Sequence, residues 1–453
     1  MNKAFKLFSA LLLLLALFSA GTASAQSSDI SPYSRYGIGD LQDQSSVLNF
    51  SMGGTGIAYH NDSITPFFIN LKNPASYAYG FIPYQDTSGK GGIKMASFET
   101  GIVDNILKLS TEGQTSKSNN AYLSYIVLNM PVSRHVGLSM GLTPVSSLGY
   151  NISQFNTVDS ITVQNQYQGI GGFNKVFLGG AYSPFKGLSL GANISYIFGN
   201  LTNEEDIYFP NSNQFSTLKL ENVGVHSFYA DFGMMYSVTL YKCPDKDHQE
   251  KNWYATIGLT YAPPINLNAN YSSFSGSQYY NGSSIVNMDT LTDTSYVGKL
   301  KMPAIYGAGI TIKKGEKWTF SFDYTMSQWS QYSDFGQSEN LINSYKYGVG
   351  IQYVPKKMYA TSYFQRIHYR LGASYGQNYL DLYNTPLKDM SVSAGLGLPV
   401  GLFRPYKRSA VVNLGIQVGS MGTTSNNLIK QDYVKLMFGF TFDDSWFEKQ
   451  KFY

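Results

Sequence analysis

The stretch Trp318-Thr319-Phe320-Ser321-Phe322-Asp323-Tyr324-Thr325-Met326-Ser327 decides the fold class. Large apolar and small polar side chains alternate along it with a period of two, which puts the apolar groups on one face of a β-strand. The same alternation returns in residues 188–198, 367–375, 390–398 and 434–442. The dominant pattern of the chain is therefore that of β-structure.

Composition excludes several classes of protein. Charged residues make up 14% of the 453 residues, against about 25% in ordinary soluble proteins. Helical bundles and coiled coils need charged faces, so they are excluded. A net charge of +4 offers no concentrated basic surface for nucleic acid. Cys243 is the single cysteine, and the five histidines form no ligand-spaced pair, so we expect no disulfide framework, metal site or cofactor.

Residues 1–25 have the features of a secretory signal peptide. Lys3 and Lys6 precede an apolar run over 7–18, and Ala23-Ser24-Ala25 is a small-x-small cleavage site. No later stretch reaches the roughly 20 apolar residues of a membrane helix. Any membrane crossing by the exported protein must therefore be made by strands.

The alternating segments favour a transmembrane barrel over a soluble β-sandwich. Many exceed the ~9–11 residues that cross a bilayer, and their second face carries Gly, Ser, Thr and Asn. We count about fourteen strands within residues 95–443, followed by a periplasmic tail at 444–453. Compact links alternate with longer ones, such as the outer loop expected within 270–297. This pattern predicts an antiparallel barrel in the outer membrane of a Gram-negative bacterium, with both termini periplasmic.

Residues 26–94 precede the first predicted strand. They are irregular, but Phe67 and Phe68 are among several apolar side chains there that need burial. We expect this segment to plug the lumen as a hatch; the alternative is a loose periplasmic arm.

Short motifs of this segment resemble the N-terminal hatch of the FadL/TodX outer-membrane transporters. They are Gly53-Gly54-Thr55-Gly56-Ile57-Ala58, then Asn61-Asp62, then Asn73-Pro74-Ala75-Ser76, and a further match is Pro303-Ala304-Ile305-Tyr306-Gly307. The resemblance implies a monomeric barrel of fourteen strands that carries long-chain fatty acids or other hydrophobic molecules inward. It also implies a kink in the third strand that opens the wall sideways.

In this sequence the kink would lie at Pro144 and Gly149, since proline cannot donate to the ladder and glycine permits a bulge. The alternative is that Pro144 lies near a strand edge or the barrel rim.

Candidate ligand-binding residues are Phe67, Phe68, Arg35, Arg370 and His368. An arginine in the lumen could hold a fatty-acid carboxylate by charge-assisted hydrogen bonds. The alternative for Arg370 is a structural pair with Asp323 or with an acidic group of the hatch.

No catalytic residue is predicted. Gly137-Leu138-Ser139-Met140-Gly141 and Gly187-Leu188-Ser189-Leu190-Gly191 match G-x-S-x-G, but both lie in alternating strands and not in a strand-turn-helix.

The sequence thus predicts passive transport of a hydrophobic small molecule by a barrel in contact with outer-membrane lipids. The alternative is a structural or protein-secretion partner, whose working surface would be the outer loops, above all 270–297.

Overall fold

The computed structural model describes residues 31–60, 68–79, 81–83, 92–158, 161–209, 215–245, 250–281, 284–355, 362–403 and 408–445. The signal peptide, Phe67, the Asn61-Asp62 pair and residues 446–453 of the tail predicted at 444–453 lie outside these ranges, whereas residues 444 and 445 continue the last strand. None of the helices within them is long and apolar enough to cross a bilayer.

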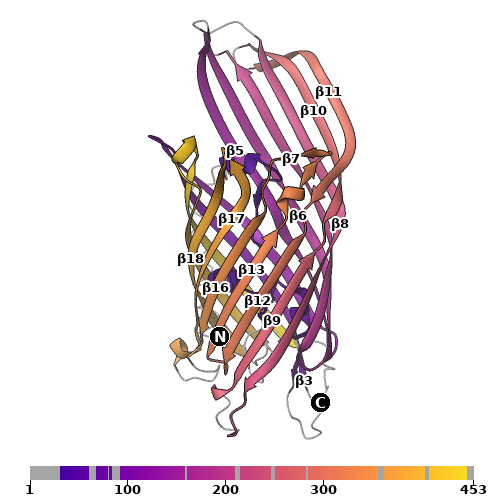
Figure 1. The fold of residues 1–453 in the computed structure, drawn as a ribbon, viewed down its shortest axis with the longest axis vertical. Helices are drawn as coiled ribbons and strands as arrows, with labels where there is room; N and C mark the ends of the chain where they lie inside the picture. Colours follow the sequence, from indigo (N-terminus) through magenta and orange to yellow (C-terminus); the bar gives the residue numbers. More distant parts are fainter. Residues whose placement is uncertain are drawn as a thin grey trace, which may run out of the picture.

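The wall is a closed antiparallel β-barrel (Figure 1). Its strands are β3 (Gly92–Ser110), β4 (Thr115–Pro131), β5 (Val136–Val158), β6 (Ile161–Phe185), β7 (Leu188–Tyr208), β8 (Ser216–Tyr241), β9 (Trp253–Ala262), β10 (Ile265–Asn281), β11 (Ser284–Met302), β12 (Ile305–Lys314), β13 (Trp318–Ser327), β16 (Ser344–Tyr353), β17 (His368–Leu382), β18 (Thr385–Phe403), β19 (Arg408–Met421) and β20 (Lys430–Ser445). The ladder between β20 and β3 closes the barrel.

Two positions in the wall are occupied by interrupted strands. β8 pairs with β9 along one half and with β10 along the other, so β9 and β10 form one strand broken at Pro263 and Pro264. β11 and β12 form another, broken at Pro303 and Ala304. Proline cannot donate to the ladder, which explains both breaks. Counted this way, the barrel has the predicted 14 strands.

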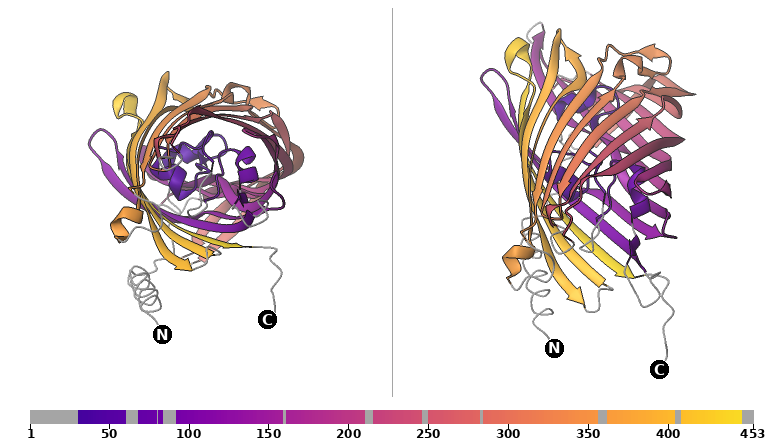
Figure 2. Two further views of the ribbon diagram at one scale, coloured as in Figure 1. Left: turned by 90° about the horizontal axis from the view of Figure 1, so that it is seen from below. Right: turned by 60° about the horizontal axis from the view of Figure 1, so that its bottom comes forward.

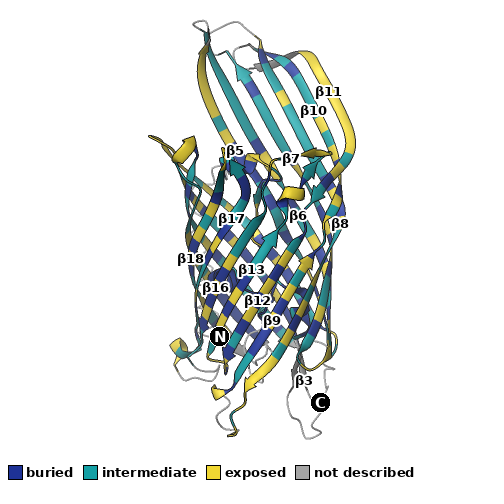
Figure 3. Ribbon diagram, viewed as in Figure 1, coloured by how far each residue is buried: buried dark blue, intermediate teal, exposed yellow. Residues whose placement is uncertain are grey.

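The period of two separates the outside of the wall from its inside (Figure 3). On β3, Ile102 and Ile106 are 49% and 42% exposed, whereas Val103 and Asn105 between them, and Glu99 before them, are buried. Outward apolar side chains suit a lipid environment, and the small polar side chains point inward.

One group of neighbouring strands projects beyond the rest of the wall (Figure 1). They are β5, β6, β7, β8, β10 and β11, and we call their projecting part the extension. Its outer face on β6 carries Gln164, Gln166 and Gln168 in place of apolar residues. The extension therefore suits water and not lipid.

Residues 31–60 and 68–79, which precede the barrel, lie inside it (Figure 2). They form the 3-10 helices η1 (Pro32–Arg35) and η2 (Pro74–Tyr79), the strand β1 (Asp40–Leu41) and the short helix α2 (Val47–Ser51). α2 packs near β17, β18 and β19, whereas η2 packs near β5 to β8. We refer to residues 31–60 and 68–79 as the N-terminal segment.

One predicted loop is wrong. Residues 270–297 fall largely within β10 and β11, which pair from Ile265–Met302 to Asn281–Ser284. Tyr271 and Tyr296 face each other across this ladder with ring centroids 4.9 Å apart. Residues 289–297 are exposed on both faces of β11, and no apolar alternation marks 272–297 in the sequence.

Candidate functional site

The glycine motif of the N-terminal segment lies against the inner wall. Gly53 and Gly54 have φ values of +70° and +77°, a backbone conformation that favours glycine. The backbone N–H of Gly53 donates to Oγ of Ser393 at 3.0 Å. A Cβ on Gly372 of the wall would overlap the backbone nitrogen of Gly53. Glycines on both surfaces thus allow backbone to approach backbone.

A carboxylate of the wall holds the end of this motif. Oδ2 of Asp323 on β13 accepts hydrogen bonds from the N–H groups of Gly56, at 2.6 Å, and Ile57, at 2.8 Å. Asp323 is 5% exposed, so these charge-assisted bonds form away from bulk water. The predicted pairing of Arg370 with Asp323 is wrong, because Asp323 binds the N-terminal segment instead.

The Asn73-Pro74-Ala75 motif makes a second junction with the wall. The amide of Asn73 donates to the carbonyl of Ile57 at 2.7 Å and to that of Met234 on β8 at 3.2 Å. Its side-chain oxygen accepts from the N–H of Ala75 at 3.0 Å, which fixes the start of η2. The asparagine therefore joins both parts of the N-terminal segment to the barrel.

Arg370 is buried in the interior and held by neutral amides. Its Nε donates to Gln352 and its Nη1 to Asn413, each at 2.9 Å. Gln352 in turn donates to the hydroxyl of Tyr59 in the N-terminal segment at 3.1 Å. His368 precedes Arg370 by two residues on β17 and lies on the same face. Arg370 is thus connected to the N-terminal segment through Gln352.

Arg35 and Phe68 have other surroundings. Arg35 is exposed at the end of η1, with its guanidinium 4.8 Å from the ring centre of Tyr167 on the extension. Phe68 packs edge-on against Tyr59 at 4.8 Å, beside buried Leu48 and Met52. Phe68 is thus linked to Arg370 through Tyr59 and Gln352, whereas Arg35 lies elsewhere, against the extension.

Sequence reasoning missed three further anchors. Glu99 accepts hydrogen bonds from the N–H of Ile69 at 2.9 Å and from the hydroxyl of Tyr125 at 2.7 Å. Lys313 donates to the carbonyl of His60 at 2.7 Å. Glu99 and Lys313 were detectable, because charged side chains are rare on the inward face of the predicted strands.

The third missed anchor is Asp43, which pairs with Lys72 of the N-terminal segment and with Lys346 on β16, the latter at 2.9 Å. Burial would raise the pKa of Asp43, but the ammonium groups of Lys346 and Lys72 hold it well below its usual range. Its carboxylate is therefore ionised at neutral pH.

The wall is incomplete between β4 and β5. These strands pair only from Pro131–Gly137 to Ile126–Leu142. Just beyond, β4 has a register shift in its ladder with β3 between Gly101 and Ile102, and β5 has one between Pro144 and Ser146. Bulges bend strands, so two at one level separate β4 from β5. We call this gap the seam.

β1 of the N-terminal segment lies on the β5 side of the seam. Asp40 pairs with Ser147 and Leu41 with Ser146. Gly149 accepts a hydrogen bond from the N–H of Ser31 at 2.9 Å. Gly149 itself pairs regularly with Ile170, so the bend on β5 lies at Pro144 and not at Gly149.

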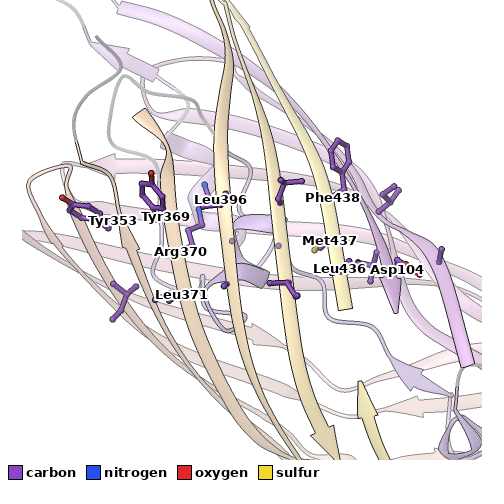
Figure 4. A pocket seen from close by; sticks show the side chains of 18 of the residues that line it. Asp104, Tyr353, Tyr369, Arg370, Leu371, Leu396, Leu436, Met437 and Phe438 are labelled. Atoms are coloured by element: carbon purple, nitrogen blue, oxygen red, sulfur yellow. The ribbon is translucent and has the colours of Figure 1, made fainter. Parts of the chain in front are cut away.

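An apolar groove runs along the outside of the wall and reaches β4 (Figure 4). Its volume is about 1190 Å³. Outward apolar side chains of β16 to β20, β3 and β4 line it, among them Leu123, Leu371, Leu396, Leu414 and Leu436. A hydrophobic molecule in this groove would lie against the lipid-facing side of the barrel, beside the seam.

The two G-x-S-x-G matches lie in strands. Ser139 on β5 and Ser189 on β7 are both buried on the inward face, and Ser139 donates to the carbonyl of Leu128 at 3.2 Å. Both motifs lie within long strands, so the strand-turn-helix of a nucleophile elbow is absent at each.

This architecture defines a transmembrane β-barrel of the outer-membrane type, filled by its own N-terminal segment. The family model described as BamG matches residues 6–453, so the chain belongs to the BamG family. No curated protein matches the sequence.

Solved structures share the fold at low identity. The Pseudomonas putida toluene transporter TodX is 14% identical, with 90% of this chain and 100% of that chain covered and a TM-score of 0.57. A Pseudomonas aeruginosa FadL homologue is 12% identical, with 89% and 98% covered and a TM-score of 0.53. The Ralstonia pickettii toluene transporter TbuX is 14% identical, with 88% and 98% covered and a TM-score of 0.53.

Proposed function

We propose that this barrel passes hydrophobic small molecules across the outer membrane and that the seam between β4 and β5 is their exit into the lipid. Long-chain fatty acids are one candidate class of cargo. The observation that carries the proposal is the end of β4–β5 pairing at Ile126–Leu142, beside an apolar groove of about 1190 Å³. Passage would be passive, down a gradient. We infer that the barrel works as a monomer, with both termini in the periplasm and the extension outside the cell.

The interior limits the route. Asp323, Glu99 and Lys313 fasten the N-terminal segment to the wall from three different strands. A straight path through the lumen would break these contacts. A sideways path past β1 displaces the short pairing of Asp40 and Leu41 with β5 and the neighbouring hydrogen bond from the N–H of Gln42 to the carbonyl of Val145, but no buried charged anchor. The seam is therefore the less costly exit, and Pro144 is the residue that keeps it open.

A reversible crosslink tests this route. Asp40→Cys with Ser147→Cys, in a Cys243→Ser background, puts two thiols on directly paired residues of β1 and β5. Paired residues on antiparallel strands have Cα atoms about 4.5–5.5 Å apart, within reach of a disulfide. Liposomes holding the oxidised protein should take up a fluorescent fatty acid slowly, and reduction should restore uptake. Equal uptake in both states would exclude a route past β1.

Ligand identity needs a separate measurement. Mass spectrometry of small molecules that copurify with the full chain would name the cargo class. Phe68→Ala should lower occupancy without preventing assembly, because its ring packs on Tyr59 inside the barrel. Phe67→Ala is the parallel variant.

A second candidate function is that of a structural or protein-secretion partner. The observation that favours it is the extension, which rises above the rest of the wall (Figure 1) and lies beyond the seam, off the route proposed for a small molecule. The family to which the chain belongs also bears a different name from the toluene transporters. Deletion of the tips of β10 and β11 would abolish such a role and leave small-molecule uptake unchanged.

A further inference from the structure

The extension has an edge strand whose backbone is open on one side. β5 pairs with β6 over its whole projecting length, from Gly149–Ile170 to Val158–Ile161. On its other side β4 stops at Leu142, and β1 covers only Ser146 and Ser147. Among the strands that the structure describes, none pairs with residues 150–158 on this side. We call this stretch the β5 edge.

The direction of the open groups follows from Gly149. Its N–H donates to Oγ of Ser34 at 3.1 Å and its carbonyl accepts from the N–H of Ser31, both on the side away from β6. Alternate residues of a strand turn their N–H and C=O to the same side. Asn151, Ser153, Phe155 and Thr157 therefore present their backbone groups to the open side.

The β5 edge lacks the protection that free edges usually carry. Natural edge strands are guarded by charged side chains, prolines or bulges. Residues 150–158 contain no charged residue and no proline, and Phe155 is 64% exposed. The opposite edge of the extension, β11, carries Asp289, Asp293 and Lys299. Only one of the two edges is therefore built to receive another strand.

A strand of this same chain already lies against β5 next to the open stretch. β1 adds to β5 directly below it, so a strand from elsewhere in the chain already extends the same ladder. The extension is polar outside, at Gln164, Gln166 and Gln168, so lipid does not cover the edge. The nine residues 150–158 span about 26 Å from the first Cα to the last, at roughly 3.3 Å per step. A polypeptide of that length is the ligand that matches a row of alternating donors and acceptors.

We propose that the β5 edge binds an extended, uncharged strand of a partner protein by backbone hydrogen bonding, continuing the ladder that β1 begins. The site is independent of small-molecule passage, and it uses backbone groups at 151, 153, 155 and 157. Side chains of the partner strand would alternate between the two faces of the extension.

Site-specific photocrosslinking in intact outer membranes tests the site. A photoreactive amino acid replaces Ser153 or Phe155, one at a time, in the full chain. The expected result is that both positions crosslink to one polypeptide, at residues two apart and in antiparallel order. Crosslinked residues three or four apart would indicate a helix and overturn the proposal. Crosslinks to residues 150–158 of a second copy would overturn it in favour of a dimer.

A backbone variant separates hydrogen bonding from simple proximity. Ser153→Pro removes one open N–H, and we expect it to lower crosslinking from Phe155 by about tenfold or more. Ser153→Ala is the matched control and should leave crosslinking unchanged. If Ser153→Pro does not assemble, Ser153→Lys tests the same edge by adding a guarding charge. Unchanged crosslinking in an assembled Pro or Lys variant would overturn the proposal.

Discussion

Oδ2 of Asp323 on β13 lies 2.6 Å from the backbone nitrogen of Gly56, a residue 267 positions earlier in the chain. The same oxygen accepts the N–H of Ile57 at 2.8 Å. One buried carboxylate thus binds the backbone at the end of the glycine motif and holds it against the wall.

Asp323→Ala should loosen the N-terminal segment. It leaves two N–H groups without their acceptor, at a cost of about 1–3 kcal/mol each where water cannot replace it. Limited proteolysis of the folded barrel should cut within residues 31–79 sooner than in wild type. Asp323→Asn keeps an acceptor oxygen, so its rate of cleavage should fall between those of wild type and Asp323→Ala. Equal cleavage in all three proteins would show that this contact does not hold the segment.

A methyl group on the inner wall should displace the N-terminal segment directly. Gly372→Ala places a Cβ onto the backbone of Met52 and Gly53, neither of which can yield as a side chain would. Gly180→Ala is the matched control, since its Cβ would meet only a side-chain carbon of Leu138 at 3.5 Å. Both variants should keep the heat-modifiable gel mobility of a folded barrel. Only Gly372→Ala should expose the segment to protease; equal exposure in both would contradict the prediction.

The strands of the wall are predictable from the sequence because the residues of each strand match the surroundings of its two faces. Alternation such as that of Trp318 to Ser327 arises when one face meets lipid and the other the interior. This signal fails in residues 270–297, where water lies on both sides of β10 and β11. The period and the turn composition then give no contrast between strand and loop, so the sequence predicts a loop where β10 and β11 lie.

The site is less predictable because its contacts join distant residues. Pro144 marks the bend of β5 in the sequence, but nothing near Asp40 indicates that it pairs with Ser147. The partners of Arg370, Gln352 and Asn413, are neutral amides on neighbouring strands. Neutral amides are common in this chain, so no local pattern selects these two over the carboxylates expected there.

Arg370→Lys should separate a structural role from ligand binding. Lysine is a point donor and lacks the planar fork that reaches both Gln352 and Asn413. We expect a lower unfolding temperature in detergent, since a buried acceptor left unpaired costs about 1–3 kcal/mol. Binding of a fatty acid and of a neutral hydrocarbon should change equally. Selective loss of the fatty acid, at unchanged stability, would instead assign Arg370 to the carboxylate of a ligand.

The ion pairs of Asp43 predict how pH affects the N-terminal segment. Lys346 and Lys72 outweigh the effect of burial and hold the pKa of Asp43 well below its usual range. A lowered pKa means that the charged form stabilises the docked state above the ordinary value of about 3.9, and that this stability is lost as pH falls through the lowered value.

Asp43→Asn should therefore increase proteolytic cleavage of residues 31–79 at pH 7, with the difference from wild type constant between about pH 5 and 8. The difference should vanish only in strong acid, where Asp43 is protonated and neutral in the wild type. Acid-stable pepsin allows the low-pH arm of the measurement. Asp432→Asn, which removes an exposed pair with Lys430 on β20, is the matched control and should cleave as wild type does at every pH. A difference that shrinks as pH falls from 8 to 5 would instead show that Asp43 titrates there and that the two lysines do not hold its charge.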